Sequence, residues 1–170
     1  MFDPATQVTP CAAALLEIIP EDRPYRLIEV GVLRGHTMAT LLHRRPLLSI
    51  VGVDDWRQAV RGMLGREIKE QAHDLLRPFG DRACLLECAS AKGAGIAGKA
   101  DVVHIDADHG YHGCLADCRA YWPLAGEWMC GHDYGHGRFP DVQSAVWAFA
   151  EEIGATYEVF PQWKHWRIRK

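Results

Sequence analysis

The chain has 170 residues, 48% of them hydrophobic, and carries a formal net charge of −3 at pH 7. The length and the hydrophobic content are typical of one domain with its own core. The chain has no stripe of basic residues, so we expect no nucleic-acid partner. No apolar run is long enough to cross a bilayer, and the first residues lack the basic and apolar regions of a secretory signal, so we expect a cytoplasmic protein without membrane contact.

Helices and strands are expected to alternate along the chain. A helix at residues 10–19 precedes a buried strand at 26–30, and Thr37 is expected to cap a second helix that runs to about His43. Further strands are expected at 47–53, 83–86, 101–105 and 128–131; further helices at 58–76, 114–121 and 141–152, with a loop or short helix at 93–98. Residues 157–160 and 163–168 form an expected antiparallel pair.

This alternation predicts an α/β fold with a mostly parallel sheet, helices on both faces and an antiparallel terminal hairpin. Residues 1–170 are expected to form a single domain in which a helical segment, 1–25, precedes the core, 26–170. Ligands of such folds bind beyond the carboxyl ends of the strands, so the residues that follow each strand are the candidate site residues.

The first two strands end in a pattern typical of nucleotide binding. Gly31 and Gly35 lie in the first turn, where they permit a tight bend, and the N–H groups of the next helix favour a carboxylate or phosphate. Asp54 ends the second strand, where an acid can accept hydrogen bonds from both ribose hydroxyls. An isolated aspartate is more often a turn residue, but the pair of features indicates a nucleotide site. Glu29, at the end of an apolar strand, needs a partner such as a ligand amine or backbone N–H groups.

Two later strands each end in acids and histidines. Residues 101–111 read DVVHIDADHGY, and residues 127–134 read EWMCGHDY. Adjacent strands that deliver carboxylate and imidazole groups to one edge would make a site, and a metal site is one interpretation. His104 lies within its strand, where a hydrogen-bonded core histidine is the expected role. The six cysteines contain no C-x-x-C pair and are expected to be reduced thiols.

These motifs, in this order, resemble the class I S-adenosylmethionine-dependent methyltransferases. More narrowly, they are similar to the small-molecule O-methyltransferases grouped with the macrolide-sugar methyltransferases and cephalosporin-hydroxylase-like proteins. The resemblance covers residues 26–150 and rests on LIEVG at 27–31, VGVDDW at 51–56, VHIDADHGY at 103–111, WPL at 122–124, GHDY at 131–134 and VQSAV at 142–146. It implies a Rossmann-like, seven-stranded sheet with a reversed last strand.

The resemblance also implies transfer of a methyl group from S-adenosylmethionine to a hydroxyl oxygen of a small molecule, such as a sugar, a phenol or another natural product. The residues expected to bind the cofactor are Glu29, Gly31 and Gly35 around its methionine end, Asp54 at the ribose, Trp56 near the nucleoside, Ser90 along the adenine, and Asp106.

In the metal-dependent relatives, one acid after the fourth strand and two polar residues after the fifth bind Mg²⁺, and these match Asp106, His132 and Asp133. A divalent ion bound by few side chains keeps positions open for a substrate hydroxyl and lowers its pKa. The relatives usually carry a carboxylate at position 132, and imidazole suits Mn²⁺ or Zn²⁺ better than Mg²⁺. Three alternatives stay open: another metal, a His132 that is not a ligand, or a metal-free site.

His109 matches the histidine that acts as general base in the macrolide-type relatives, and with Asp106 it forms the expected catalytic pair. The ordinary pKa of imidazole suits proton abstraction at neutral pH. The alternative is a histidine that caps the following helix or hydrogen-bonds Asp108, which itself could orient His109.

Other functions remain open. The chain could be an inactive S-adenosylmethionine-binding module or a subunit that supports an active partner. The HIDADH stretch at 104–109 superficially resembles the metal box of metallo-hydrolases, but that fold needs a β-sandwich, which the alternating helices disfavour. With only about twenty-five residues before the first strand, the acceptor pocket must be open or completed by another subunit, which favours a homo-oligomer.

Overall fold

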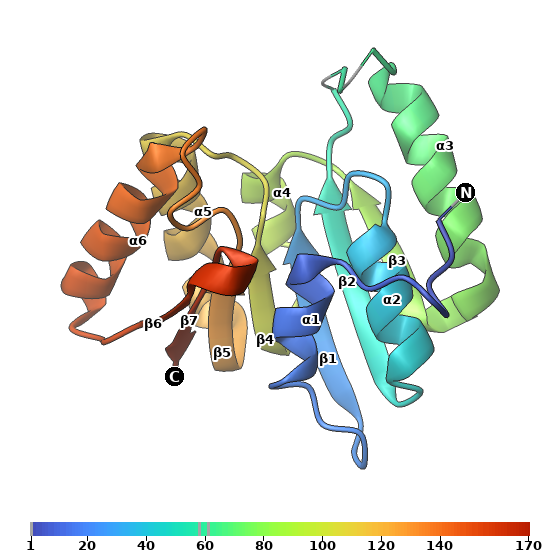
Figure 1. Ribbon diagram of the computed structural model, residues 1–170, viewed down its shortest axis with the longest axis horizontal. Helices are drawn as coiled ribbons and strands as arrows, with labels where there is room; N and C mark the ends of the chain where they lie inside the picture. Colours follow the sequence, from blue (N-terminus) through green and yellow to red (C-terminus); the bar gives the residue numbers. More distant parts are fainter. Residues whose placement is uncertain (1, 58, 61) are drawn as a thin grey trace.

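In the computed structural model, described for residues 2–57, 59–60 and 62–170, one seven-stranded sheet has the strand order β3-β2-β1-β4-β5-β7-β6. The strands are β1 Tyr25–Val30, β2 Leu48–Asp54, β3 Ala83–Glu87, β4 Ala100–Ile105, β5 Ala125–Gly131, β6 Glu158–Phe160 and β7 His165–Arg169. The first five are parallel, and β7 runs antiparallel to β5 and β6 (Figure 1). The expected α/β, Rossmann-like architecture with a terminal hairpin is confirmed.

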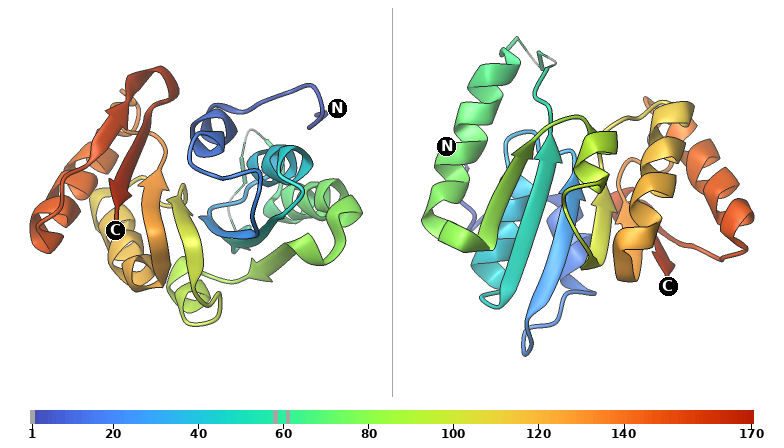
Figure 2. Two further views of the ribbon diagram at one scale, coloured as in Figure 1. Left: turned by 90° about the horizontal axis from the view of Figure 1, so that it is seen from below. Right: turned by 180° about the vertical axis from the view of Figure 1, so that it is seen from behind.

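Helices cover both faces of the sheet (Figure 2). The helices are α1 Pro10–Leu16, α2 His36–Arg44 and α3 Gly65–Leu76 on one face, and α4 Ser90–Ala94, α5 Tyr111–Tyr121 and α6 Pro140–Ile153 on the other. The described residues also form 3₁₀ helices: η1 Arg77–Arg82 between α3 and β3, η2 Trp122–Leu124 between α5 and β5, and η3 Pro161–Trp163 between β6 and β7. In the described part of the chain, no helix has the length and apolar character needed to cross a membrane.

Strand alternation divides the core into two layers. In β1, Ile28 and Val30 face the cluster built with α5 and α6, whereas Leu27 faces the cluster built with α1, α2 and α3. Because successive side chains of a strand point to opposite faces, Glu29 shares the α1 face with Leu27. This places the buried carboxyl group of Glu29 on the α1 face, among mainly apolar side chains and beneath the edge where the candidate site lies.

The helix boundaries differ from the expected ones mainly at the N-termini. α2 begins at His36 because Gly35, with φ 74°, ends the preceding turn as the N-cap. The expectation that Thr37 caps this helix is therefore wrong: Thr37 lies in the first turn, and its hydroxyl is 3.1 Å from that of Thr9. The helix expected from residue 58 begins at Gly65; Gln58 itself lies outside the described residues.

Gly31 joins β1 to the candidate site, and its geometry gives a stability prediction. Its φ is 94°, and a Cβ at this position would overlap the backbone carbonyl of Asp106. Gly31→Ala should therefore lower the free energy of unfolding in urea by at least about 2 kcal/mol, because both steric overlap and a left-handed backbone oppose a side chain. Gly137, where a Cβ would meet nothing within 4 Å, is the matched control. An equal loss of unfolding free energy in Gly31→Ala and Gly137→Ala would contradict this account.

Asp117 of α5 is a buried acid, 4% exposed, whose Oδ2 has no hydrogen-bond partner among the described residues. Burial raises the pKa of Asp117 to about 6, against a hydrogen bond with Ser90 that lowers it. An acid with a raised folded-state pKa binds more protons in the folded state, so stability falls as pH rises from about 4 to about 6 and stays lower above that range. Asp117→Asn should raise the free energy of unfolding at pH 7.5 by about 1–3 kcal/mol.

The increase in the free energy of unfolding caused by Asp117→Asn should vanish at pH 4, where the Asp117 carboxyl is protonated in the folded protein. Urea unfolding at the two pH values measures the difference, with Asp141→Asn in the first turn of α6 as the exposed control. A gain that does not depend on pH would show that packing, and not charge, decides the effect.

Candidate active site

The carboxyl ends of four parallel strands meet at one edge of the sheet. Backbone hydrogen bonds continue past the strands and tie the loops together: Gly31 N–H donates to Val53 O over 2.8 Å, Asp106 N–H to Val30 O over 2.7 Å, and His132 N–H to Ile105 O over 3.2 Å. The residues that follow β1, β4 and β5 are therefore held beside one another by the strand register.

Four of the expected site residues converge there. His109 Nε2 lies 2.8 Å from Asp133 Oδ2 and 3.7 Å from Asp106 Oδ1. His132 Nδ1 lies 3.2 Å from Asp133 Oδ1 and 3.9 Å from Asp106 Oδ1. We call Asp106, His109, His132 and Asp133 the acid–imidazole cluster. Its His109 and Asp106 side chains are 31% and 25% exposed, so a small molecule can reach them.

The two carboxylates control the charge of the two imidazoles. Asp106 and Asp133 raise the pKa of His109 to about 10, although burial opposes the shift. Burial also disfavours a charge on His132, but its interactions with Asp133 and Asp106 outweigh burial and raise the pKa. For Asp133, burial would raise the pKa, yet the hydrogen bonds from His109 and His132 hold it below its usual range. With no cation bound, this raised pKa favours the imidazolium form of His109, whose charge offsets part of the negative charge of the two carboxylates.

Neighbouring residues hold His109 in place. Its ring stacks on Phe139 with ring centroids 4.2 Å apart, a contact that the sequence reading missed. The available signal was an aromatic residue directly before Pro140, at the N-terminus of α6. Asp108 does not serve as the orienting partner, because its Oδ1 accepts the N–H of Gly110 at 2.8 Å at the start of α5.

Asp54 organises the opposite half of the edge. Its Oδ2 accepts the N–H groups of Val32 and Leu33 at 2.9 and 2.8 Å, and its Oδ1 accepts the N–H of Trp56 at 2.8 Å. A carboxylate has about four acceptor positions, so one remains for a ligand hydroxyl. Asp54 thus ties the turn after β1 to the loop after β2.

Trp56 has a similar structural role. Its Nε1–H donates to Leu33 O over 2.8 Å, and the side chain is only 7% exposed. Leu33, Trp56 and Asp133 have φ values of 51°, 45° and 59°, in the left-handed region that non-glycine residues rarely adopt. Such strained residues cluster at functional sites. These three follow β1, β2 and β5, at the same edge of the sheet.

The remaining expected cofactor residues lie around this edge at different depths. Gly35 is the N-cap of α2, and within the described part of the chain no side chain caps the first turn, so its N–H groups can meet an anion. Ser90 begins α4, half-buried, with its carbonyl accepting the Tyr121 hydroxyl at 2.8 Å. Glu29 is 2% exposed and lies beneath the edge, with Oε1 3.5 Å from His104 Nδ1.

The acid–imidazole cluster has a donor set that fits a divalent cation. One ligand atom each from Asp106, His109 and Asp133 lies within 4.8 Å of the others. Two carboxylates with one imidazole suit Mn²⁺ or Zn²⁺ and tolerate Mg²⁺. This group contains His109, whereas the residue expected from the sequence was His132, which flanks it.

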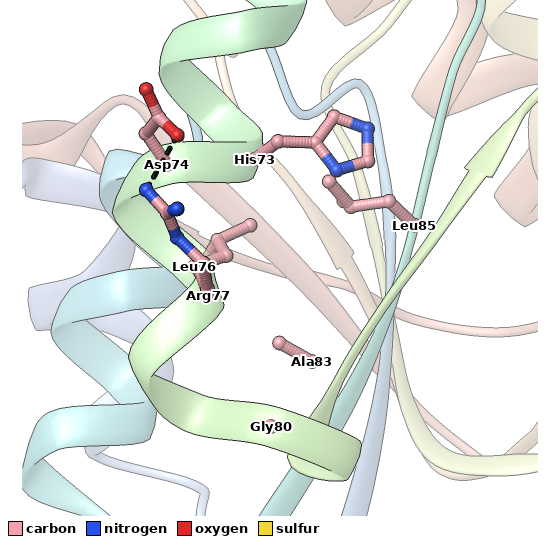
Figure 3. A pocket seen from close by; sticks show the side chains of 7 residues that line it. All are labelled: His73, Asp74, Leu76, Arg77, Gly80, Ala83 and Leu85. Atoms are coloured by element: carbon pink, nitrogen blue, oxygen red, sulfur yellow. Dashed lines mark hydrogen bonds and ion pairs between the residues drawn. The ribbon is translucent and has the colours of Figure 1, made fainter.

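Cavities formed by other described residues lie outside the cluster. A cavity of about 440 Å³ between α3, η1 and β3 is lined by His73, Asp74, Leu76, Arg77, Gly80, Ala83 and Leu85 (Figure 3). None of the expected site residues lines it. A cavity of about 370 Å³ is lined by Tyr134, Pro140, Gln143, Ser144, Trp147 and Tyr157. None of the four cluster residues lines this second cavity, although Tyr134 directly follows Asp133 in the chain.

The sheet order, the glycine turn after β1 and the polar residues after β4 and β5 define the class I S-adenosylmethionine-dependent methyltransferase fold. A family model described as a methyltransferase domain matches residues 28–134, more than half of the chain. The chain therefore belongs to this methyltransferase family. No curated protein matches the sequence.

Solved structures with the same fold include O-methyltransferases. One described as a caffeoyl-CoA O-methyltransferase from Staphylococcus aureus has a TM-score of 0.74 at 12% identity, covering 96% of this chain and 83% of that one. CalS11, a TDP-rhamnose 3'-O-methyltransferase of calicheamicin biosynthesis, has a TM-score of 0.67 at 18% identity, covering 94% and 76%. The S-adenosylhomocysteine-bound methyltransferase PaMTH1 from Podospora anserina has a TM-score of 0.63 at 15% identity, covering 86% and 71%. Similarity at this level establishes the fold.

Proposed function

We propose that this methyltransferase transfers a methyl group from S-adenosylmethionine to a hydroxyl oxygen of a small molecule. The observation that carries the proposal is the convergence of Asp106, His109, His132 and Asp133 at the edge that also bears the glycine turn. The O-methyltransferases among the structures of similar fold support it. Oxygen methylation requires a group that removes a proton and groups that orient the oxygen, and this cluster contains both types.

S-adenosylmethionine would supply the electrophilic methyl group, and we assign its binding to the loops after β1 to β4. The free N–H groups at the start of α2, after Gly31 and Gly35, suit the carboxylate of its methionine end. The remaining acceptor position of Asp54 suits a ribose hydroxyl, and Ser90 would lie along the adenine. Trp56 would act by fixing the loop, since its ring is buried.

A divalent cation would orient the acceptor oxygen and lower its pKa, and Asp106 and Asp133 are the residues proposed to hold it, with an imidazole as third ligand. The mixed donor set favours Mn²⁺ over Mg²⁺. His132 and His109 both lie within reach of these carboxylates, so one can complete the metal site while the other stays free. His109, whose Nε2 faces both carboxylates, is the proposed general base for a hydroxyl held there. A cation bound by Asp106 and Asp133 would offset the negative charge that raises the pKa of His109, and this would favour the neutral imidazole that the role requires.

Turnover with S-adenosylmethionine and a panel of sugars, phenols and other hydroxylated small molecules tests the proposal, with and without Mn²⁺ and Mg²⁺. Mass spectrometry of the product should show one added methyl group on oxygen. Binding of S-adenosylhomocysteine without turnover on any acceptor or metal would favour an inactive binding module or a supporting subunit. A homo-oligomer that completes the acceptor pocket stays a prediction, which light scattering of the purified chain measures.

The cofactor half gives its own prediction. Asp54→Ala should weaken S-adenosylhomocysteine binding by about 1–3 kcal/mol in calorimetric titration, because it removes a hydrogen-bonding partner of the ribose and frees three backbone N–H groups. Asp55→Ala is the matched control, since among the described residues the carboxylate of Asp55 contacts Arg57 of its own loop. Equal affinity for both variants would remove Asp54 from the cofactor site.

A further inference from the structure

A row of polar side chains crosses the α1 face of the sheet beneath the acid–imidazole cluster. Glu29 of β1 pairs in register with His104 of β4, and His104 with Cys130 of β5. His165 of β7 stacks on His104, with ring centroids 5.4 Å apart. Glu29, His104 and His165 are each at most 2% exposed. Burial also lowers the pKa of His165 to about 2, so it adds no charge to the row.

His104 and Glu29 are not satisfied by the protein. Both ring nitrogens of His104 and Oε2 of Glu29 lack hydrogen-bond partners within the described ranges. The expectation of a hydrogen-bonded core histidine is therefore wrong among the described residues: Glu29 Oε1 lies 3.5 Å from Nδ1 but does not complete a hydrogen bond with it. Both ring nitrogens of His165 also lack partners within these ranges. Each unpartnered buried polar group costs about 1–3 kcal/mol, so a row of them needs an explanation.

α1 completes the surroundings of His104 with a thiol. Thr9 caps this helix by accepting the N–H of Ala12 at 3.1 Å, and the helix buries Cys11 to 6% exposure. Cys11 Sγ lies 3.8 Å from Asp106 Oδ2. One ligand atom each of Cys11, His104 and Asp106 lies within 4.8 Å of the others.

The carboxylate of Asp106 therefore faces two groups of residues. Its Oδ1 faces His109 and His132 in the acid–imidazole cluster, and its Oδ2 faces Cys11. The two groups share one residue and differ in chemistry: the outer group has carboxylate and imidazole donors, and the inner group adds sulfur.

We propose that Cys11, His104 and Asp106 form a second metal site that binds a transition-metal cation such as Zn²⁺. Thiolate, imidazole and carboxylate form a donor set that Zn²⁺ accepts and that Mg²⁺ disfavours. The cation supplies the missing partner of His104, and the carboxyl group of Glu29, whose pKa burial raises, lies beside it. The proposal does not rest on methyl transfer, since the donor set is complete without a cofactor or acceptor.

Binding at this inner site exchanges a proton for the metal. Burial, and next Asp106, raise the pKa of the Cys11 thiol, so the metal-free protein keeps its proton. The metal–sulfur bond forms as the S–H bond breaks, and the proton leaves to solvent. The bound ion would tie α1 to the sheet and fix the orientation of the Asp106 carboxylate from below.

Titration of the chelator-treated full chain with Co²⁺ tests the site, because cobalt bound to a thiolate absorbs in the near ultraviolet whereas cobalt bound to oxygen and nitrogen alone does not. The wild-type chain should develop this band at one equivalent of Co²⁺. Cys11→Ser should abolish it, and His104→Gln should weaken Co²⁺ binding by more than the roughly 10–100-fold typical of losing an outer-sphere partner. Cys118→Ser, at a buried thiol on the opposite face of the sheet, should keep the band.

Asp133→Asn distinguishes the two sites. It should keep the cobalt–thiolate band of the inner site, whereas it should weaken metal binding at the outer site formed by Asp106, His109 and Asp133. Zn²⁺ should also raise the melting temperature of the wild-type chain and of Asp133→Asn, but not of His104→Gln. Absence of the band in the wild-type chain, or its persistence in Cys11→Ser, would overturn the proposal. Calorimetry with S-adenosylhomocysteine reports on the proposed function separately and does not depend on this result.

Discussion

His109→Gln should slow methyl transfer by roughly 10²–10⁴-fold, the usual contribution of a general base. Affinity for S-adenosylhomocysteine should stay unchanged, because His109 contacts Asp106, Asp133 and Phe139 and none of the loops assigned to the ribose or adenine. Glutamine keeps a hydrogen-bond donor near Asp133 but accepts no proton at neutral pH. Single-turnover rates and calorimetry, measured on the same preparation, separate the two effects.

The control for this change is His112→Gln. His112 is an exposed residue in the first turn of α5, three positions after His109. This control carries the same substitution without contact to the carboxylates, so turnover should remain near that of the wild-type chain. A His109→Gln chain with wild-type turnover would exclude His109 as the base and would leave it the role of neutralising Asp133 in the cation-free protein.

Asp133→Asn should lower the affinity for Mn²⁺ by about 10–100-fold, the equivalent of losing a charge-assisted interaction of about 1.5–3 kcal/mol. Turnover at low metal concentration should fall at least as far. The substitution suits the backbone, because asparagine is among the residues that tolerate the left-handed conformation, and Asp133 has a φ of 59°. If Asp133→Asn folds normally but binds Mn²⁺ more weakly, the loss of affinity is therefore due to the missing carboxylate charge and not to backbone strain.

Asp141→Asn is the control for Asp133→Asn, since Asp141 is an exposed acid in the first turn of α6. Metal titration followed by electron paramagnetic resonance of Mn²⁺ measures both variants. Unchanged Mn²⁺ affinity in Asp133→Asn would remove the cation from the proposed mechanism and leave acid–base chemistry alone.

The double variant connects the two predictions. His109 Nε2 and Asp133 Oδ2 are 2.8 Å apart, so their effects on turnover should not add. If both residues act on one acceptor hydroxyl, the double variant should be little slower than the slower single variant. Additive losses would indicate that the residues serve separate steps.

The order of strands and helices could be predicted because apolar runs alternate with amphipathic segments throughout the chain. The same pattern located Asp106 and Asp133, since residues that follow parallel strands collect at one edge of the sheet. The predicted first residues of the helices were less accurate than the predicted order of the elements. Gly35 caps α2 through a backbone conformation, and sequence patterns report side chains better than they report backbone dihedral angles.

The sequence by itself determined the fold class and the edge of the sheet at which the candidate site lies, because both depend on local periodicity and on which residues end each strand. Only the tertiary structure decided the partners of those residues. It paired His109 with Asp133, committed Asp54 and Trp56 to holding loops together, and placed Cys11 over His104 across 93 positions of sequence. Such contacts depend on how α1 packs against the sheet and on strand order, which no local pattern in the chain encodes.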